Sequence, residues 1–238
     1  MNLKMKDMQE ELFVSLMLKK EFSPLNEARV ADERRYYKLT PSPCGKFSAI
    51  CDLLSAYKEA GSFDEAIAVC KEVLENPILK EYQASLYFQM GQLHEAKRDF
   101  PGALNYYLQT IRVGSGNSFL LYWAHNNAAF CCLIQQDFVA AEDHCRIALD
   151  LDEQYWMKWG RRYCDDRDWH AWKNMGAVME YTGRYHEAAS YYVTSIKLSR
   201  GNERAVLYFK RLLERHPELQ GWWREPVEDL FTYYKVVI

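Results

Sequence analysis

Several features that mark common classes of protein are missing from this sequence. No stretch approaches the roughly 18 to 20 uncharged apolar residues that a membrane-spanning helix needs, so we expect no membrane insertion. The first residues include Lys4, Lys6, Asp7 and Glu10, which exclude the apolar core of a signal peptide, and the acids are atypical of a transit peptide. These absences predict a soluble protein of the cytoplasm.

An excess of positive charge is also missing. The 30 lysines and arginines are outnumbered by 33 acidic residues, and no long basic stripe is present. A protein that binds nucleic acid by neutralising phosphates needs such a stripe. We therefore expect no nucleic-acid partner.

The seven cysteines are odd in number and include no C-x-x-C pair. They fit neither a disulfide framework nor the spacing of a zinc finger, so we interpret most of them as small buried packing residues. The motifs GxxxxGK[ST], HExxH and GxSxG and the Rossmann glycine fingerprint are absent as well. We expect no enzymatic activity, no catalytic residues, no cofactor and no metal.

What the sequence does contain is an internal repeat. An aromatic residue followed three positions later by alanine occurs four times, as Phe63 and Ala66, Phe100 and Ala103, Phe138 and Ala141, and Tyr185 and Ala188. Successive aromatic residues are 37, 38 and 47 positions apart. Four copies at comparable spacing argue against an ordinary helical bundle, in which such pairs would reflect core packing alone.

Two of the four units carry a longer pattern. The fourth unit has Trp172, Met175, Gly176, Met179, Gly183, Tyr185, Ala188 and Tyr192, and the second has Tyr87, Met90, Gly91, His94, Phe100, Ala103 and Tyr107. This pattern resembles the tetratricopeptide repeat, a helix–turn–helix unit of 34 residues with W-x2-L-G-x2-Y, then A-x3-F, then Pro. The other two units depart from it: Leu54 stands where a small residue is usual, and Gln136 replaces the turn glycine.

The resemblance implies an all-α fold, a right-handed α-solenoid of about four units over residues 47–202. We place the units at residues 47–80, 84–117, 122–155 and 169–202, with an insertion at 156–168. Small residues such as Gly91 and Gly176 let the two helices of a unit approach closely. No unit can bury its apolar face alone, so neighbouring units must stack.

The predicted amino-terminal extension, residues 1–46, contains an amphipathic segment. Apolar residues recur at helical spacing over 3–17, from Leu3 to Met17. This helix either docks a partner or packs on the first repeat, and we favour packing because the ends of a stack need cover. Ser23 and Pro24 predict the start of a second helix that runs to about Tyr37, and residues 40–43 then form a linker.

Beyond the fourth unit, residues 203–238 are predicted to form a capping helix and an aromatic tail. Residues 203–215 have the apolar spacing of a helix. The tail contains Trp222, Trp223 and Phe231 and is too apolar to stay free, so it either folds back into the concave face or binds something else. The insertion near Trp159 is rich in aromatic residues and arginine, and either forms part of a binding surface or packs inward as an extended second helix.

In tetratricopeptide stacks the first helices of the units line a concave groove, which binds extended peptides or helices. Carrying the register over places these residues on that face: Phe88, Gln89, Gln92, Trp123, Asn126, Asn127, Phe130, His170, Lys173, Asn174 and Tyr181. Amide groups can pair with a peptide backbone, and aromatic rings provide apolar area. These residues and Trp159 are the predicted partner-binding residues.

A subgroup of the family holds the carboxylate tail of heat-shock chaperones with a Lys and an Asn on one repeat, an Asn on the next, and a Lys and an Arg on the third. When these five clamp positions are aligned with the second, third and fourth units of this sequence, only Asn127 matches. The other four positions hold Phe88, Gln92, His170 and Asn174. We expect such tails to bind poorly.

Two functions remain open on the sequence alone. The first is a non-enzymatic adaptor, scaffold or chaperone-like protein that binds a protein or peptide partner in the groove. The second is a self-assembling structural protein, a homo-oligomer in which the amino-terminal helix or the carboxy-terminal tail docks into a neighbouring subunit.

Overall fold

The computed structural model describes residues 24–114, 116–159 and 169–223, with only the backbone for residues 155–159. All regular structure in these ranges is helical, which confirms the predicted all-α fold. None of the helices there is both long and apolar enough to cross a membrane. The chain divides into two compact units, Met1–Gly116 and Asn117–Ile238. The predicted helix 3–17 and the end of the tail lie outside the described residues.

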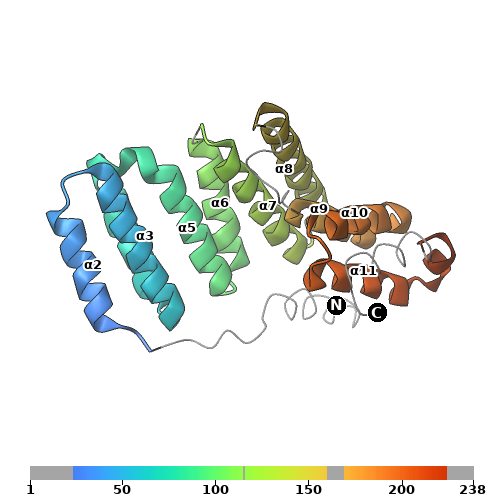
Figure 1. Cartoon of the computed structure of the whole chain (residues 1–238), viewed down its shortest axis with the longest axis horizontal. Helices are drawn as coiled ribbons and strands as arrows, with labels where there is room; N and C mark the ends of the chain where they lie inside the picture. Colours follow the sequence, from blue (N-terminus) through green and yellow to red (C-terminus); the bar gives the residue numbers. More distant parts are fainter. Residues whose placement is uncertain (1–23, 115, 160–168, 224–238) are drawn as a thin grey trace. The chain divides into compact units, whose positions relative to one another are not determined.

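The first unit holds a leading helix and two helix pairs, of which α2, α3, α5 and α6 are labelled in Figure 1. Its elements are α2 (Glu27–Leu39), α3 (Pro43–Ala60), α4 (Phe63–Leu74), the 3-10 helix η1 (Pro77–Tyr82), α5 (Gln83–Ala96) and α6 (Phe100–Val113). Helix α2 packs on α3, α3 packs on α4, and α5 packs on α6. The apolar residues of α3, α4, η1 and α5 form one buried core.

The second unit also holds two helix pairs, followed by a single helix. Its elements are α7 (Ser118–Ile134), α8 (Phe138–Trp159), α9 (His170–Tyr181), α10 (Tyr185–Leu198), α11 (Glu203–Arg215) and the 3-10 helix η2 (Pro217–Leu219). Helix α7 packs on α8 and α9, and α11 packs on α10 and α9. The bounds of α11 are those of the predicted capping helix.

The structure corrects three predicted boundaries. Helix α2 begins at Glu27, because the side chain of Asn26 accepts a hydrogen bond from the backbone N–H of Arg29 (3.0 Å) and caps it. Pro43 begins α3 and does not belong to the linker, since its fixed φ suits the first helical position behind the cap Ser42. Helix α8 continues to Trp159, so the start of the predicted insertion is helical.

The two well-formed repeats share a close contact between glycine and tyrosine. A Cβ atom on Gly91 would lie 2.5 Å from the ring of Tyr107, and one on Gly176 would lie 2.6 Å from the ring of Tyr192. Both tyrosines are fully buried. Because no side chain separates the helices at the glycine, the ring of the second helix packs directly on the backbone of the first.

The two degenerate repeats fill the same space with a different pair. Leu54 and Cys70 share one core in the first repeat, and Ala129 and Cys145 are both buried in the third. Their separation along the chain equals that of Gly91 and Tyr107. The larger first residue is therefore accommodated because a small cysteine stands where the other repeats have tyrosine. Burial raises the pKa of the Cys70 thiol to about 12, so this cysteine acts as a packing residue.

The turn inside each helix pair contains one residue with left-handed backbone. These residues are Gly61 (φ 72°), Arg98 (φ 63°), Gln136 (φ 64°) and Gly183 (φ 80°). The replacement of the turn glycine at Gln136 has therefore left the turn geometry unchanged. Arg98 and Gln136 hold a conformation that suits glycine better.

Candidate functional site

The predicted binding residues of the first unit lie on α5, beside α3. The ammonium group of Lys58 on α3 donates to Oε1 of Gln89 (2.6 Å) and Oε1 of Gln92 (3.2 Å). The ring of Phe88 is buried against Tyr107, with 5.6 Å between ring centroids. The two glutamines thus tie α5 to α3 through their carbonyl oxygens, and Phe88 belongs to the core.

In the second unit, the amides of α7 and α9 form a chain. Asn174 on α9 donates from Nδ2 to Oδ1 of Asn126 on α7 (3.0 Å) and to its backbone oxygen (3.3 Å). Asn126 in turn donates to Oδ1 of Asn127 (3.0 Å). Asn126 and Asn174 are buried, whereas Asn127 is half-buried. The amides of Asn126 and Asn174 therefore join α7 to α9. Asn127 is the most exposed of the three asparagines.

Lys173 lies beside this amide chain and is 8% exposed. Its Nζ lies 5.0 Å from the centroid of the Tyr208 ring on α11 and 5.9 Å from that of Phe130 on α7. Among the described residues, no carboxylate lies within ion-pair distance of it. Burying an ammonium group is costly unless it is paired, and two aromatic faces replace only part of its hydration. The ammonium group of Lys173 thus has no hydrogen-bond acceptor among the described residues.

An aromatic strip runs across the amino-terminal ends of α7 and α9. Trp123 lies edge-on to Phe119, with 6.2 Å between centroids, and packs against His170 at 5.3 Å. His170 stacks on Trp169 at 4.1 Å. Phe119 is 57% exposed, so the strip presents apolar area at the surface.

The last two predicted residues lie apart from this strip. Tyr181 packs on Phe138, with 5.8 Å between ring centroids, and is half-buried at the carboxy-terminal end of α9. The side chain of Trp159 lies outside the described part of the structure.

A buried ionic contact attaches α11 to the last repeat, and the sequence analysis missed it. Glu180 accepts a hydrogen bond from the hydroxyl of Tyr192 (2.9 Å) and pairs with Arg215 (2.9 Å). Glu95 accepts from Tyr107 (2.6 Å) in the same way in the first unit. The signal was present in the sequence, since a glutamate follows the close-packing glycine by four residues in both repeats.

Two histidines pair inside the second unit. Nδ1 of His125 on α7 lies 3.0 Å from Nδ1 of His144 on α8. Burial, together with the charge of His144, lowers the pKa of His125 to about 4, and burial also lowers the pKa of His144. Both rings are neutral near pH 7, one donating to the other. His125 is therefore a packed, hydrogen-bonded side chain.

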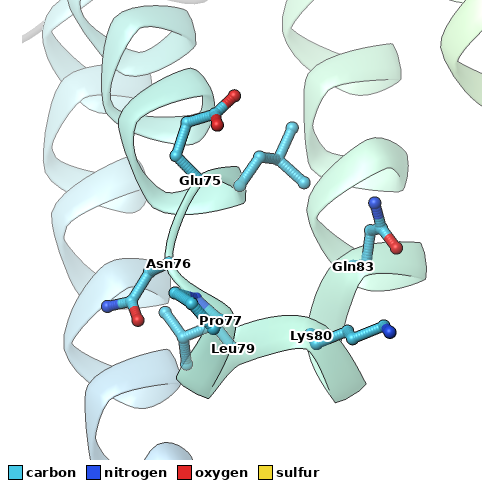
Figure 2. A pocket seen from close by; sticks show the side chains of 7 residues that line it. Glu75, Asn76, Pro77, Leu79, Lys80 and Gln83 are labelled. Atoms are coloured by element: carbon cyan, nitrogen blue, oxygen red, sulfur yellow. The ribbon is translucent and has the colours of Figure 1, made fainter.

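The remaining chemistry of the described residues is sparse. They contain no group of three or more His, Cys, Asp or Glu side chains that could hold a metal ion. A hollow of about 200 Å³ lies between the end of α4, η1 and the start of α5 (Figure 2). The charged residues among those that line it are Glu75 and Lys80.

The two units are built from consecutive antiparallel helix pairs, the architecture of a helical-repeat protein. Residues 47–76, which include most of α3, all of α4 and the two residues after it, match the family model described as tetratricopeptide repeat. Residues 47–76 therefore carry a tetratricopeptide repeat. Repeats of this family are generally protein-interaction modules.

Solved structures with a similar fold are also known. The OM64 TPR domain of Arabidopsis is 22% identical over 56% of this chain and 96% of its own, with a TM-score of 0.45. The second TPR domain of human RPAP3, in complex with the HSP70 peptide SGPTIEEVD, is 21% identical over 54% and 97%, with a TM-score of 0.42. BtubC (BKLC) from P. vanneervenii is 14% identical over 82% and 92%, with a TM-score of 0.56, which shows a shared fold. No curated protein sequence matches the chain.

Proposed function

We propose that this protein is a non-enzymatic adaptor, scaffold or chaperone-like protein whose second unit binds a peptide or a helix of a partner. The proposed binding region is the Lys173 face, formed by the half-buried Asn127 and the largely buried Phe130, Lys173 and Tyr208. The observation that carries the proposal is the buried ammonium group of Lys173, which has two aromatic rings but no acceptor among the described residues.

The chemistry of the Lys173 face suits the backbone or the side chains of a peptide. Lysine has three N–H donors, and Nδ2 of Asn127 has no acceptor in the described part of the chain. Both groups can therefore donate to carbonyl or carboxylate oxygens. The aromatic strip of Phe119, Trp123, Trp169 and His170 supplies apolar area of the kind that contributes most to binding energy.

The proposal keeps the amide groups of Gln89 and Gln92 as binding residues of the first unit. It assigns a structural role to Asn126 and Asn174, because their amides bond to each other. It also retains the expectation of poor binding to chaperone tails, since four of the five positions that would hold the carboxylates carry other residues.

A capture experiment tests the Lys173 face. The immobilised protein is exposed to extract of its native cells, and bound proteins are quantified by mass spectrometry for the wild type, Lys173→Met and Asn127→Ala. We expect the specific partner to fall about tenfold for each variant, the loss of one charge-assisted contact. Lys71→Met is the matched control, because Lys71 is exposed on α4. Equal capture by wild type and Lys173→Met, with unchanged circular dichroism, contradicts the proposal.

Self-assembly is the second candidate function, and the exposure of Trp222 favours it. This side chain is 75% exposed near the end of the described chain. Light scattering of the full chain, compared with chains lacking residues 1–20 or 221–238, separates the two functions. A mass of 28.1 kDa for the full chain at all concentrations excludes self-assembly.

A further inference from the structure

The ammonium group of the buried Lys173 side chain is still open to solvent. Only 8% of this residue is exposed. Among the described residues, the side-chain nitrogens that are fully buried and lack a hydrogen-bond partner are Nε2 of His94 and Nε1 of Trp172 and Trp223. Nζ of Lys173 also lacks such a partner there but is not fully buried. The exposed part of the residue therefore includes the ammonium group, which a ligand can reach.

No carboxylate of the described residues pairs with Lys173. Helix α7 contains no Asp or Glu, and the acid of α9 is Glu180. That carboxylate is already engaged, because it accepts from the hydroxyl of Tyr192 (2.9 Å) and pairs with Arg215 (2.9 Å). Burial raises the pKa of the Cys145 thiol, so this group, which lies in the field of the lysine, is neutral as well. The charge of Lys173 is thus left for a ligand to neutralise.

Helix α11 adds positive charge around the ring of Tyr208. Arg204 and Arg211 lie one turn before and one turn after this residue, on the side of the helix that carries the ring. Neither arginine forms an ion pair with a described residue. The acids of α11, Glu203 and Glu214, are turned to the other side, because they stand five and six residues from Tyr208. The surroundings of the ring are therefore basic and favour a negatively charged ligand.

We propose that the Lys173 face binds the side chain of a glutamate that lies within an acidic segment of the partner. The inference rests on the proposed function, which assigns this face to a peptide or a helix, and it adds the chemistry of the ligand. A bound peptide displaces the remaining water from the ammonium group, and a neutral carbonyl would leave the charge of that group uncompensated. A carboxylate supplies the opposite charge and accepts a charge-assisted hydrogen bond from Nζ.

The two rings beside Lys173 select a glutamate side chain over the carboxylate at the end of a chain. The ring centroids of Tyr208 and Phe130 lie 5.0 Å and 5.9 Å from Nζ, so both rings flank the ammonium group. The methylene groups of a glutamate can pack on these rings while its carboxylate reaches Nζ. A terminal carboxylate is attached directly to the backbone and has no such apolar spacer. Neighbouring acids of the segment can pair with Arg204 and Arg211.

Selection from a display library of random short peptides on the immobilised full chain tests the inference. We expect most binders to share a glutamate at one fixed position. In calorimetry with the tightest binder, replacement of that glutamate by glutamine should weaken binding about tenfold, the loss of one charge-assisted contact. The same peptide change should have little effect on Lys173→Met, because the ammonium group is gone. Lys71→Met, changed at an exposed position of α4, is the control and keeps the full difference.

Amidation of the peptide's carboxy terminus separates the two sources of a carboxylate, and it should leave the affinity unchanged. A loss of affinity on amidation assigns the face to a terminal carboxylate and overturns the inference. A tenfold loss that persists in Lys173→Met overturns it as well, because the glutamate then binds elsewhere.

The remaining outcomes distinguish the inference from the proposed function. Binders without an acid, or equal binding of the glutamate and glutamine peptides to the wild type, overturn the inference alone, since a peptide still binds. A library that yields no binder contradicts the proposed function and the inference with it. The comparison on the wild type needs no substitution in the protein, so it decides the matter even if Lys173→Met does not fold.

Discussion

At the residue scale, close packing in this protein is set by pairs of positions 16 apart along the chain. The glycine of the second repeat faces a tyrosine, whereas the third repeat has alanine facing cysteine, as Ala129 and Cys145. The two side chains of each pair together fill a similar space, but the larger side chain is on the second helix in one repeat and the volume is shared more evenly in the other. A change at one position should therefore depend on the residue at the other.

Gly91→Ala is expected to lower the free energy of unfolding by about 1 to 3 kcal/mol, because its Cβ would overlap the ring of Tyr107. The same substitution in a Tyr107→Cys background, which copies the pair of the third repeat, should cost clearly less. Urea unfolding of the four proteins of this double-mutant cycle measures the coupling. Equal costs in the two backgrounds would show that the ring does not limit the space.

Gln136→Gly is expected to raise the free energy of unfolding by about 0.5 to 1 kcal/mol. Gln136 has a φ of 64°, where a side chain is strained and glycine is not. Gln135→Gly is the matched control, since Gln135 has a φ of −84° and should lose stability from the added freedom of the unfolded chain. Thermal unfolding of both variants checks the prediction, which fails if the two shift in the same direction.

At the scale of elements, the His125–His144 pair joins α7 to α8 and makes that contact sensitive to acid. Burial lowers both pKa values below the 6.5 of a free histidine, so the unfolded chain binds more protons than the folded one between pH 6.5 and about 4. The stability that comes from the neutral pair is present above pH 6.5. It is lost as the pH falls toward 4.

We expect the second unit to lose about 1 to 2 kcal/mol between pH 7 and pH 4.5 from this pair, after allowance for solvent screening. The variant His125→Gln/His144→Gln should show a correspondingly flatter dependence. Urea midpoints across this range give the comparison. A variant whose midpoint falls as steeply as that of the wild type would assign the acid sensitivity to other groups.

At the scale of the whole molecule, the helix pairs and their repeat pattern were predictable, and the polar contacts were not. The signatures of the second and fourth repeats lie within about 20 residues each, and a local pattern of this kind is visible in the sequence. The register also placed Asn126, Lys173 and Asn174 on one face. It did not show that the two asparagines bond to each other, because they lie 48 residues apart.

The sequence by itself determined that this protein is built from helix–turn–helix repeats, because small and aromatic residues at helical spacing are a requirement of each helix pair. Only the tertiary structure decided which polar groups remain available to a partner. Pairing joins side chains from different helices, as in Asn174 with Asn126 and Glu180 with Arg215. Lys173, in contrast, packs against two aromatic rings and has no carboxylate partner among the described residues. The lack of a partner for this buried ammonium group is the physical basis of the proposed binding face.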